Sequence, residues 1–221
     1  MRTSAFSSWT TLTATTAWLL LAAAPLAASP DDPLLEQLRQ GGLVLALTAN
    51  ESGPGTAAPS PPPTCAPGTR LTKRGWQQAV ATGVGLRKQR IFVELAHAGP
   101  GCAARHTAYL VFGADRVRHD SGLTASCDAS QKVRAEHRER LATRLAGIPP
   151  YPRTNLAVVV DACNLRDLAT STWPKCASAA RVGDAVLFSP SALTPLGCVS
   201  RSRLLQWSRL PEPFGRRPGG D

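Results

Sequence analysis

Several patterns that identify common protein classes are missing from this sequence of 221 residues. It contains no run of 18 or more apolar residues, so no ordinary membrane-spanning helix is expected. It has no Gly-x-Ser-x-Gly motif, which is the usual marker of a serine hydrolase of the α/β class. The Gly-x-Gly-x-x-Gly spacing of a phosphate-binding loop is also missing. The pair Gly83 and Gly85 comes nearest to it, but both glycines lie within a helical pattern. No single motif therefore assigns a function.

Acidic and aromatic residues are both scarce. The 15 Asp and Glu residues stand against 25 Lys and Arg residues, which gives a net charge of +10 at pH 7, and aromatics make up 5%. Nucleic-acid-binding proteins usually interleave aromatic side chains with a basic stripe so that bases can stack. Here Trp76, Phe92 and Phe112 are at positions expected in the core, and acids are mixed among the bases. This pattern favours a solvated basic surface and argues against nucleic acid as a partner.

The N-terminal segment has the pattern of an export signal. Arg2 is the only charged residue before Asp31, the apolar run Ala17–Leu26 follows it, and small residues come next. We expect a signal peptide over residues 1–28, with cleavage near Ala28. Cleavage lowers the net charge to +9, leaves no membrane span and places the protein in the periplasm or outside the cell. The alternative is an uncleaved membrane anchor.

An exported chain folds where disulfides form, and the cysteine count is even. Six cysteines allow 15 pairings, so their connectivity is open. Zinc is the weaker interpretation, because no Cys-x2-Cys pair occurs and the spacings differ from those of zinc fingers. The candidate disulfide cysteines are Cys65, Cys102, Cys127, Cys163, Cys176 and Cys198.

Hydrophobic periodicity predicts alternating strands and helices. The hydrophobic content of 43% excludes wholesale disorder. The strongest strand patterns are apolar throughout, which is typical of an α/β three-layer sandwich with a largely parallel central sheet. Helices are expected over 33–40, 72–87, 102–112, 132–146 and 164–169, and strands over 43–47, 91–95, 155–160, 185–188 and 196–200. A long loop is expected over 50–67, one domain over 33–207 and a disordered tail over 208–221.

Ligands of such sheets bind beyond the carboxyl ends of the strands, which directs attention to the loops after Leu47, Leu95 and Val160. The segments around these loops resemble the histidine phosphatase superfamily, the phosphoglycerate-mutase-like proteins, and especially its exported bacterial branch. The resemblance rests on five segments in the family's order: Leu38–Leu47, Leu71–Ala79, Ala98–Ala108, Asn155–Asn164 and Gly183–Phe188. It implies the same three-layer fold and a disulfide between Cys65 and Cys102, because both cysteines match the family's pattern.

The resemblance also implies a phosphoryl-transfer site, but its four side chains are replaced here. The family uses a nucleophilic histidine and its neighbouring arginine after the first strand, a second arginine after the second strand, and a second histidine after the late strand. The corresponding residues are Ala49, Thr48, Ala103 and Asp161. Alanine offers no nucleophile, and neither Thr48 nor Ala103 can make a charge-assisted bond to phosphate. A carboxylate about 4 Å from a phosphate charge would repel it by about 4 kcal/mol at an effective dielectric constant of about 20.

Other polar residues near the strand ends are candidates for a replacement site. Asn50, His97 and Asn164 are possible lining residues, and together with Asp161 they could bind a cation or an amine. Apart from that pocket, no metal site and no cofactor are expected. His106 is expected to face outward on its helix.

The favoured interpretation is an exported histidine-phosphatase-like protein that has lost phosphatase activity and keeps a binding or structural role. Its ligand or protein partner is not identified by the sequence. One alternative is a divergent hydrolase or phosphatase that uses Asp161 and His97, which requires both side chains to converge in one cleft. The other is a basic protein that binds the cell envelope.

Overall fold

The computed structural model describes residues 32–53, 70–124, 127–190 and 193–209. A six-stranded sheet forms the centre of this part of the chain, with the order β5-β4-β6-β1-β7-β8. The first four strands of that order are parallel, and β7 and β8 are antiparallel to their neighbours. The strands are β1 (Val44–Thr48), β4 (Val93–Ala98), β5 (Val117–His119), β6 (Asn155–Val160), β7 (Ala185–Phe188) and β8 (Pro195–Val199).

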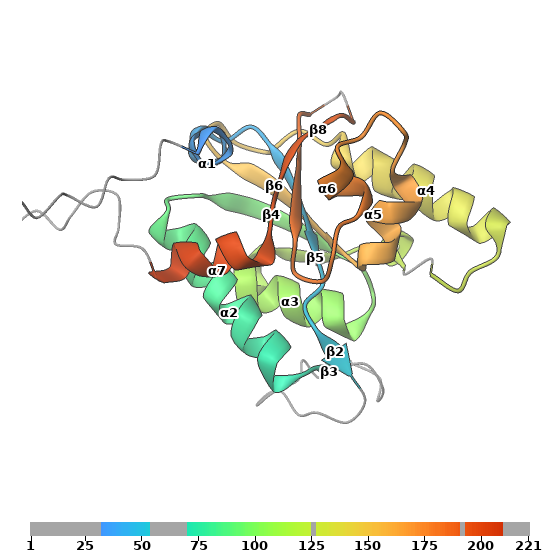
Figure 1. Ribbon diagram of the computed structural model, residues 1–221, viewed down its shortest axis with the longest axis horizontal. Coiled ribbons are helices and arrows are strands. Elements are labelled where there is room, and N and C mark those ends of the chain that lie inside the picture. Colours follow the sequence, from blue (N-terminus) through green and yellow to red (C-terminus); the bar gives the residue numbers. More distant parts are fainter. Residues whose placement is uncertain (1–31, 54–69, 125–126, 191–192, 210–221) are drawn as a thin grey trace, which may run out of the picture. The chain divides into compact units, whose positions relative to one another are not determined.

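Helices cover both faces of the sheet, which gives the three layers expected from the sequence (Figure 1). One face packs against α1 (Pro33–Gln40), α2 (Lys73–Lys88), α3 (Cys102–Phe112) and α7 (Arg201–Arg209). The other face packs against α4 (Gln131–Leu145), α5 (Ala162–Leu168) and α6 (Lys175–Ser178). The short elements are β2 (Ser52–Gly53), β3 (Arg70–Leu71), η1 (Ala114–Arg116) and η2 (Ser121–Leu123).

Local sequence explains where several helices begin. In α1, Pro33 occupies the first turn and Asp32 Oδ1 accepts a hydrogen bond from Leu34 N at 3.2 Å. In α2, Thr72 Oγ1 accepts a hydrogen bond from Gly75 N at 2.9 Å. Both are N-caps that satisfy a backbone N–H group left unpaired at the start of a helix. The helix α3 has no such side-chain cap, because its N-cap residue is Gly101.

The predicted helices and strands agree with the structure in type, several boundaries move, and the short strand β2 lies within the segment 50–67 that was expected to be a loop. β4 runs over Val93–Ala98 and not over 91–95, and Phe92 is 61% exposed, so the prediction that Phe92 is a core residue was wrong. The helix expected to begin at Asn164 begins at Ala162. The helix α7 continues to Arg209, and the remainder of the predicted tail lies outside the described residues.

Among the described residues, one disulfide joins the segment at Cys127 to α5 and another joins α6 to β8. Cys127 is bonded to Cys163 and Cys176 to Cys198, which confirms disulfide formation by these four cysteines. The predicted partner of Cys102, Cys65, lies outside the described residues, so that pairing stays a prediction. Among the described residues, no group of three or more His, Cys, Asp or Glu side chains is arranged to hold a metal ion. A search of the same residues found no helix that is both long and apolar enough to cross a membrane.

Candidate functional site

The carboxyl ends of β4, β6 and β1 lie side by side at one edge of the sheet. Thr48 is the register partner of Val160, and Ala98 is the partner of Val159. Backbone pairing continues past the strands, because Ala49 N donates to Val160 O at 2.7 Å and Gly99 N donates to Val159 O at 3.0 Å. The sheet therefore brings the segments after these three strands together, and with them the positions that the resemblance assigns to phosphate chemistry.

Thr48 forms hydrogen bonds to the loop that precedes β7. Its hydroxyl donates to Arg181 O at 2.6 Å and lies 3.0 Å from Asp184 O, and its side chain is buried. Its backbone N–H also bonds to Asp184 O at 2.9 Å. The residue that stands where the family has an arginine thus fixes the turn before β7, and its hydroxyl proton is not available to an anion.

Two alanines fill the next positions with methyl groups. Ala49 is 4% exposed and belongs to the apolar cluster between the sheet and α3, together with Ala103. A buried methyl group can neither attack phosphorus nor donate a hydrogen bond. The strand-end site therefore lacks a nucleophile at Ala49 and a cation at Ala103.

Asp161 places a carboxyl group at the end of β6. It precedes α5 but makes no side-chain cap bond, and its Oδ2 lies 3.8 Å from the point where a Cβ on Gly101 would be. The carboxyl group is thus beside the start of α3. Burial raises the pKa of Asp161 above its ordinary value of 3.8, and no neighbouring cation opposes that shift. This edge of the sheet consequently presents a carboxyl group where the family binds an anion.

His97 lies on the other face of the sheet. Its register partner Val158 packs in the cluster with α4 and α5, whereas Val159 packs on the α3 side. Because side chains alternate along an extended chain, Asp161 shares the face of Val159. Burial lowers the pKa of His97. The positive charges of Arg144 and Arg118 lower this pKa further, and the negative charge of Asp120 raises it. The structure does not bring His97 and Asp161 together.

The two candidate asparagines have different surroundings. Asn50 is 2% exposed, and its backbone N–H donates to Thr107 Oγ1 at 2.9 Å. Neither of its side-chain amide atoms has a hydrogen-bond partner in the described part of the chain. Asn164 Nδ2 donates to Thr124 O at 2.8 Å, so this amide anchors the segment after η2. Asn50 therefore lies just after the end of β1 with its amide unpaired among the described residues, whereas the Asn164 amide is occupied by its bond to Thr124 O.

Sequence reasoning placed His106 wrongly. The side chain is 3% exposed and not outward-facing, and neither ring nitrogen has a partner within the described residues. Burial lowers the pKa of His106, as do the charges of Arg105 and Arg70. The signal for burial was the apolar character of α3 as a whole, in which most side chains are buried. A second group that sequence reasoning missed comprises Arg181, Arg201 and Arg203, which line a cavity on the β8 side of the sheet.

Comparisons with known proteins address the fold. No protein-family model and no curated protein matches the sequence. Among solved structures, the Escherichia coli K-12 protein assigned as an α-ribazole-5′-P phosphatase aligns with a TM-score of 0.52 and 19% identity, covering 74% of this chain and 98% of its own. The α-ribazole phosphatase of Shigella flexneri aligns with a TM-score of 0.50 and 18% identity, covering 73% and 96%.

These matches extend over nearly the whole length of both solved structures and show that the fold is shared. The layers, the mainly parallel sheet and the position of the strand ends are those expected from the resemblance. The chain has the fold of the histidine phosphatase superfamily, with Ala49 where the resemblance places the family's nucleophilic histidine.

Proposed function

We propose that this chain is an exported protein that keeps the histidine phosphatase fold, has lost phosphoryl transfer and acts by binding a ligand or partner. The observation that carries the proposal is the pair formed by Ala49 and Asp161 at adjoining strand ends. The first lacks a nucleophile, and the second is a partly buried carboxyl group. Transfer through a covalent enzyme intermediate needs a nucleophile and fixed positive charge, and neither is supplied at these positions.

The surroundings of Asp161 support the loss of anion binding. The start of α3 alone would favour an anion through its N–H groups and the helix dipole. In this chain the Asp161 carboxyl group lies beside that helix start and repels a second anion when it is ionised. The family's positive side chains are replaced by Thr48 and Ala103, which cannot offset the repulsion.

The alternative of a hydrolase that uses His97 with Asp161 has less support. The two side chains lie on opposite faces of the sheet, and the groups that shift the pKa of His97 are Arg144, Asp120 and Arg118. A proton relay between the two would need them within hydrogen-bond reach. The structure therefore supplies no pair of groups for this mechanism.

Export is supported by two features of different kinds. The N-terminal 28 residues carry the charge and hydropathy pattern of a signal peptide. The disulfides Cys127–Cys163 and Cys176–Cys198 fit an oxidising compartment.

Hydrolysis of p-nitrophenyl phosphate tests the loss of activity. The oxidised protein from residue 29 onward should release p-nitrophenol no faster than buffer. The matched variants are Asp161→Ala, at the strand ends, and Asp128→Ala, at an exposed site. Hydrolysis above background that disappears in Asp161→Ala and persists in Asp128→Ala would contradict the proposal.

A further inference from the structure

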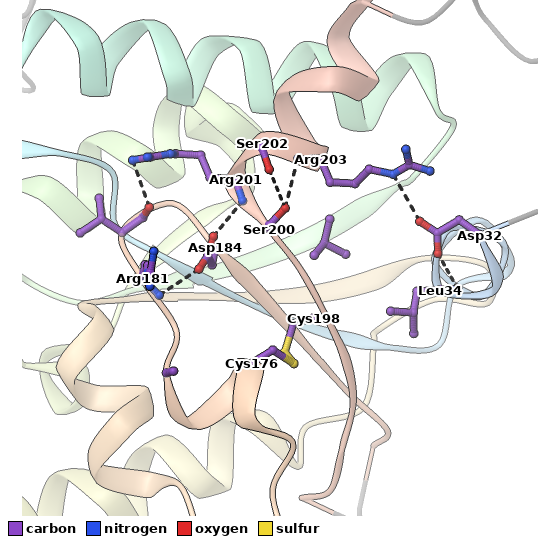
Figure 2. Close-up of a pocket in the computed structure, with 13 residues that line it drawn as sticks. Asp32, Leu34, Cys176, Arg181, Asp184, Cys198, Ser200, Arg201, Ser202 and Arg203 are labelled. Atoms are coloured by element: carbon purple, nitrogen blue, oxygen red, sulfur yellow. Dashed lines mark hydrogen bonds and ion pairs between the residues drawn. A yellow bond between two sulfur atoms is a disulfide. The ribbon is translucent and has the colours of Figure 1, made fainter. Parts of the chain in front are cut away.

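A cavity of about 620 Å³ lies beside β8. It shares the loop of Arg181 and Asp184 with the end of β1, where the Thr48 hydroxyl donates to Arg181 O. Its walls come from the start of α1, the segment between α6 and β7, and the junction of β8 with α7 (Figure 2). A volume of this size is within the range of small-molecule sites, which is about 300–1,000 Å³. The cavity can therefore hold a molecule of metabolite size.

Covalent and polar bonds fix the walls of this cavity relative to one another. The disulfide Cys176–Cys198 joins α6 to β8, and both cysteines line the cavity. Asp184 Oδ1 accepts a hydrogen bond from Arg201 N at 2.8 Å, and its Oδ2 accepts one from Arg181 N at 3.0 Å. The Asp184 carboxylate thus holds the loop before β7 against the start of α7. The site is held in shape without a ligand, which reduces the entropic cost of binding.

Three arginines line the cavity, and the side chains of Arg201 and Arg203 extend in opposite directions, Arg203 toward Asp32 (Figure 2). Arg201 Nη1 contacts Val182 O at 3.5 Å, and Arg203 Nη1 donates to Gln206 Oε1 at 2.7 Å while its Nε is 3.6 Å from Asp32 Oδ2. Arg181 is exposed, and its side chain has no hydrogen bond or ion pair within the described ranges. Each guanidinium carries five N–H donors, so most of them remain available to a ligand.

Hydroxyl groups and a helix start complete the lining. Ser200 and Ser202 flank the beginning of α7, with their hydroxyl oxygens 2.9 Å apart. Ser200 Oγ also accepts a hydrogen bond from Arg203 N at 3.3 Å. Two aspartates oppose the three arginines, but Asp184 bonds to backbone N–H groups and Asp32 is shared between Leu34 N and Arg203. The balance of charge and donors favours an oxyanion.

We propose that this cavity binds the oxyanion group of a small organic molecule, either a carboxylate or a phosphate ester. The binding site is distinct from the end of β6, where Asp161 opposes an anion, because the positive charge lies beside β8, three strands from β6 in the sheet. The proposal does not depend on whether the protein hydrolyses phosphate. It gives the basic residues of this region a specific role beyond a solvated surface.

Titration calorimetry with inorganic phosphate and with citrate, at low ionic strength and pH 7, tests the site. We expect saturable 1:1 binding of at least one of the two anions. Arg181→Gln and Arg201→Gln should each weaken that binding by about tenfold, since each removes a charge-assisted contact. Arg209→Gln removes the same charge from the same helix outside the cavity and should leave the affinity unchanged.

The two ligands distinguish the source of the oxyanion, because preference for phosphate indicates an ester and preference for citrate a carboxylate. Absence of saturable binding by both would overturn the proposal. An equal loss of affinity in Arg209→Gln and Arg181→Gln would also overturn it, because it would show non-specific attraction to a basic protein. Thermal unfolding of each variant serves as the control for folding, and Arg181→Gln disrupts no described side-chain contact. A failure here leaves the hydrolysis result unaffected, since that assay concerns Ala49 and Asp161.

Discussion

Asp161 is a carboxyl group that folding places in a less polar environment, where no described residue donates a hydrogen bond to it. Burial raises its pKa, so the folded protein binds a proton here more readily than the unfolded chain does. Ionisation therefore lowers the free energy of unfolding as the pH rises from the ordinary pKa of 3.8 through the folded value. We predict that Asp161→Asn raises the urea midpoint at pH 7 and that this advantage shrinks toward pH 4.

The control for that experiment is Asp128→Asn, which changes an exposed aspartate. Its effect on the free energy of unfolding should stay within about 0.5 kcal/mol at both pH values. Asparagine is also a good N-cap, so the start of α5 should be preserved in Asp161→Asn. A loss of stability at pH 7 in Asp161→Asn would show that the carboxylate has a partner and that the electrostatic description of the site is wrong.

For His106 the predicted change of stability with pH has the opposite sign, because folding lowers the pKa of its side chain. Its buried ring nitrogens have no partner among the described residues, and burial lowers its pKa. The unfolded chain then binds a proton more readily, so stability is lost as the pH falls below the ordinary value of 6.5. We predict that His106→Leu keeps or increases stability at pH 7, by up to about 2 kcal/mol, and reduces the loss between pH 7 and pH 5.

The matched comparison is His119→Leu on β5. His119 Nε2 lies 2.6 Å from the hydroxyl oxygen of Tyr109, so this substitution removes a hydrogen bond and should cost about 1 kcal/mol. Urea unfolding at several pH values measures both variants. Equal destabilisation by the two substitutions at pH 7 would contradict the unpartnered state of His106.

At the scale of elements, α2 approaches the chain after β1 so closely that only glycine fits at one position. A Cβ on Gly75 would overlap the carbonyl oxygen of Glu51, whose backbone also bonds to Thr72 N at 3.0 Å. Because both sides of this contact are backbone, neither can move away cheaply. Gly75→Ala should lower the free energy of unfolding by about 3 kcal/mol, measured by denaturant unfolding.

Gly53→Ala on β2 is the control, since its Cβ would meet Thr72 Cγ2 at 3.6 Å, an ordinary contact distance. We expect it to change stability by less than about 0.5 kcal/mol. If both variants unfold at the same denaturant concentration as the unsubstituted protein, the close packing of α2 on Glu51 is incorrect.

Sequence patterns predicted elements better than their ends. β1 and β6 are buried along their whole length, and their unbroken apolar runs identified them. β4 ends at Ala98, later than the sequence pattern predicted, because exposed residues within the strand interrupt its apolar pattern. Phe92 lies outside the strand although it is apolar. The four-residue helix α6 is too short to produce a periodic signal.

At the scale of the whole molecule, the order of motifs predicted the fold, and the structure matches phosphatases across most of the chain. The same order marked Thr48, Ala49, Ala103 and Asp161 as the positions to examine. It did not reveal that Thr48 bonds to residues more than 130 positions away, because such contacts depend on the folded chain. The cavity beside β8 was missed for the same reason, since α1, α6 and α7 are far apart in sequence.

The proposed export is tested on the whole chain. Expression of residues 1–221 in a bacterium should yield a processed protein that begins near Ser29, as intact mass spectrometry of the periplasmic fraction would show. Leu20→Arg places a charge in the apolar run and should block processing, whereas Thr10→Arg lies before the run and should permit it. A full-length product in the cytoplasmic fraction would contradict the assignment of a signal peptide.

We propose that the strand ends of this histidine phosphatase fold no longer accept a phosphate-like anion. The most direct test is a crystal of the mature protein soaked in tungstate, with the anion located by its anomalous scattering. We predict no tungstate among Ala49, Gly101 and Asp161, because the Asp161 carboxyl group is beside the start of α3 and Thr48 and Ala103 stand where the resemblance places the family's arginines. Tungstate bound in contact with the first turn of α3 at this position would contradict the account.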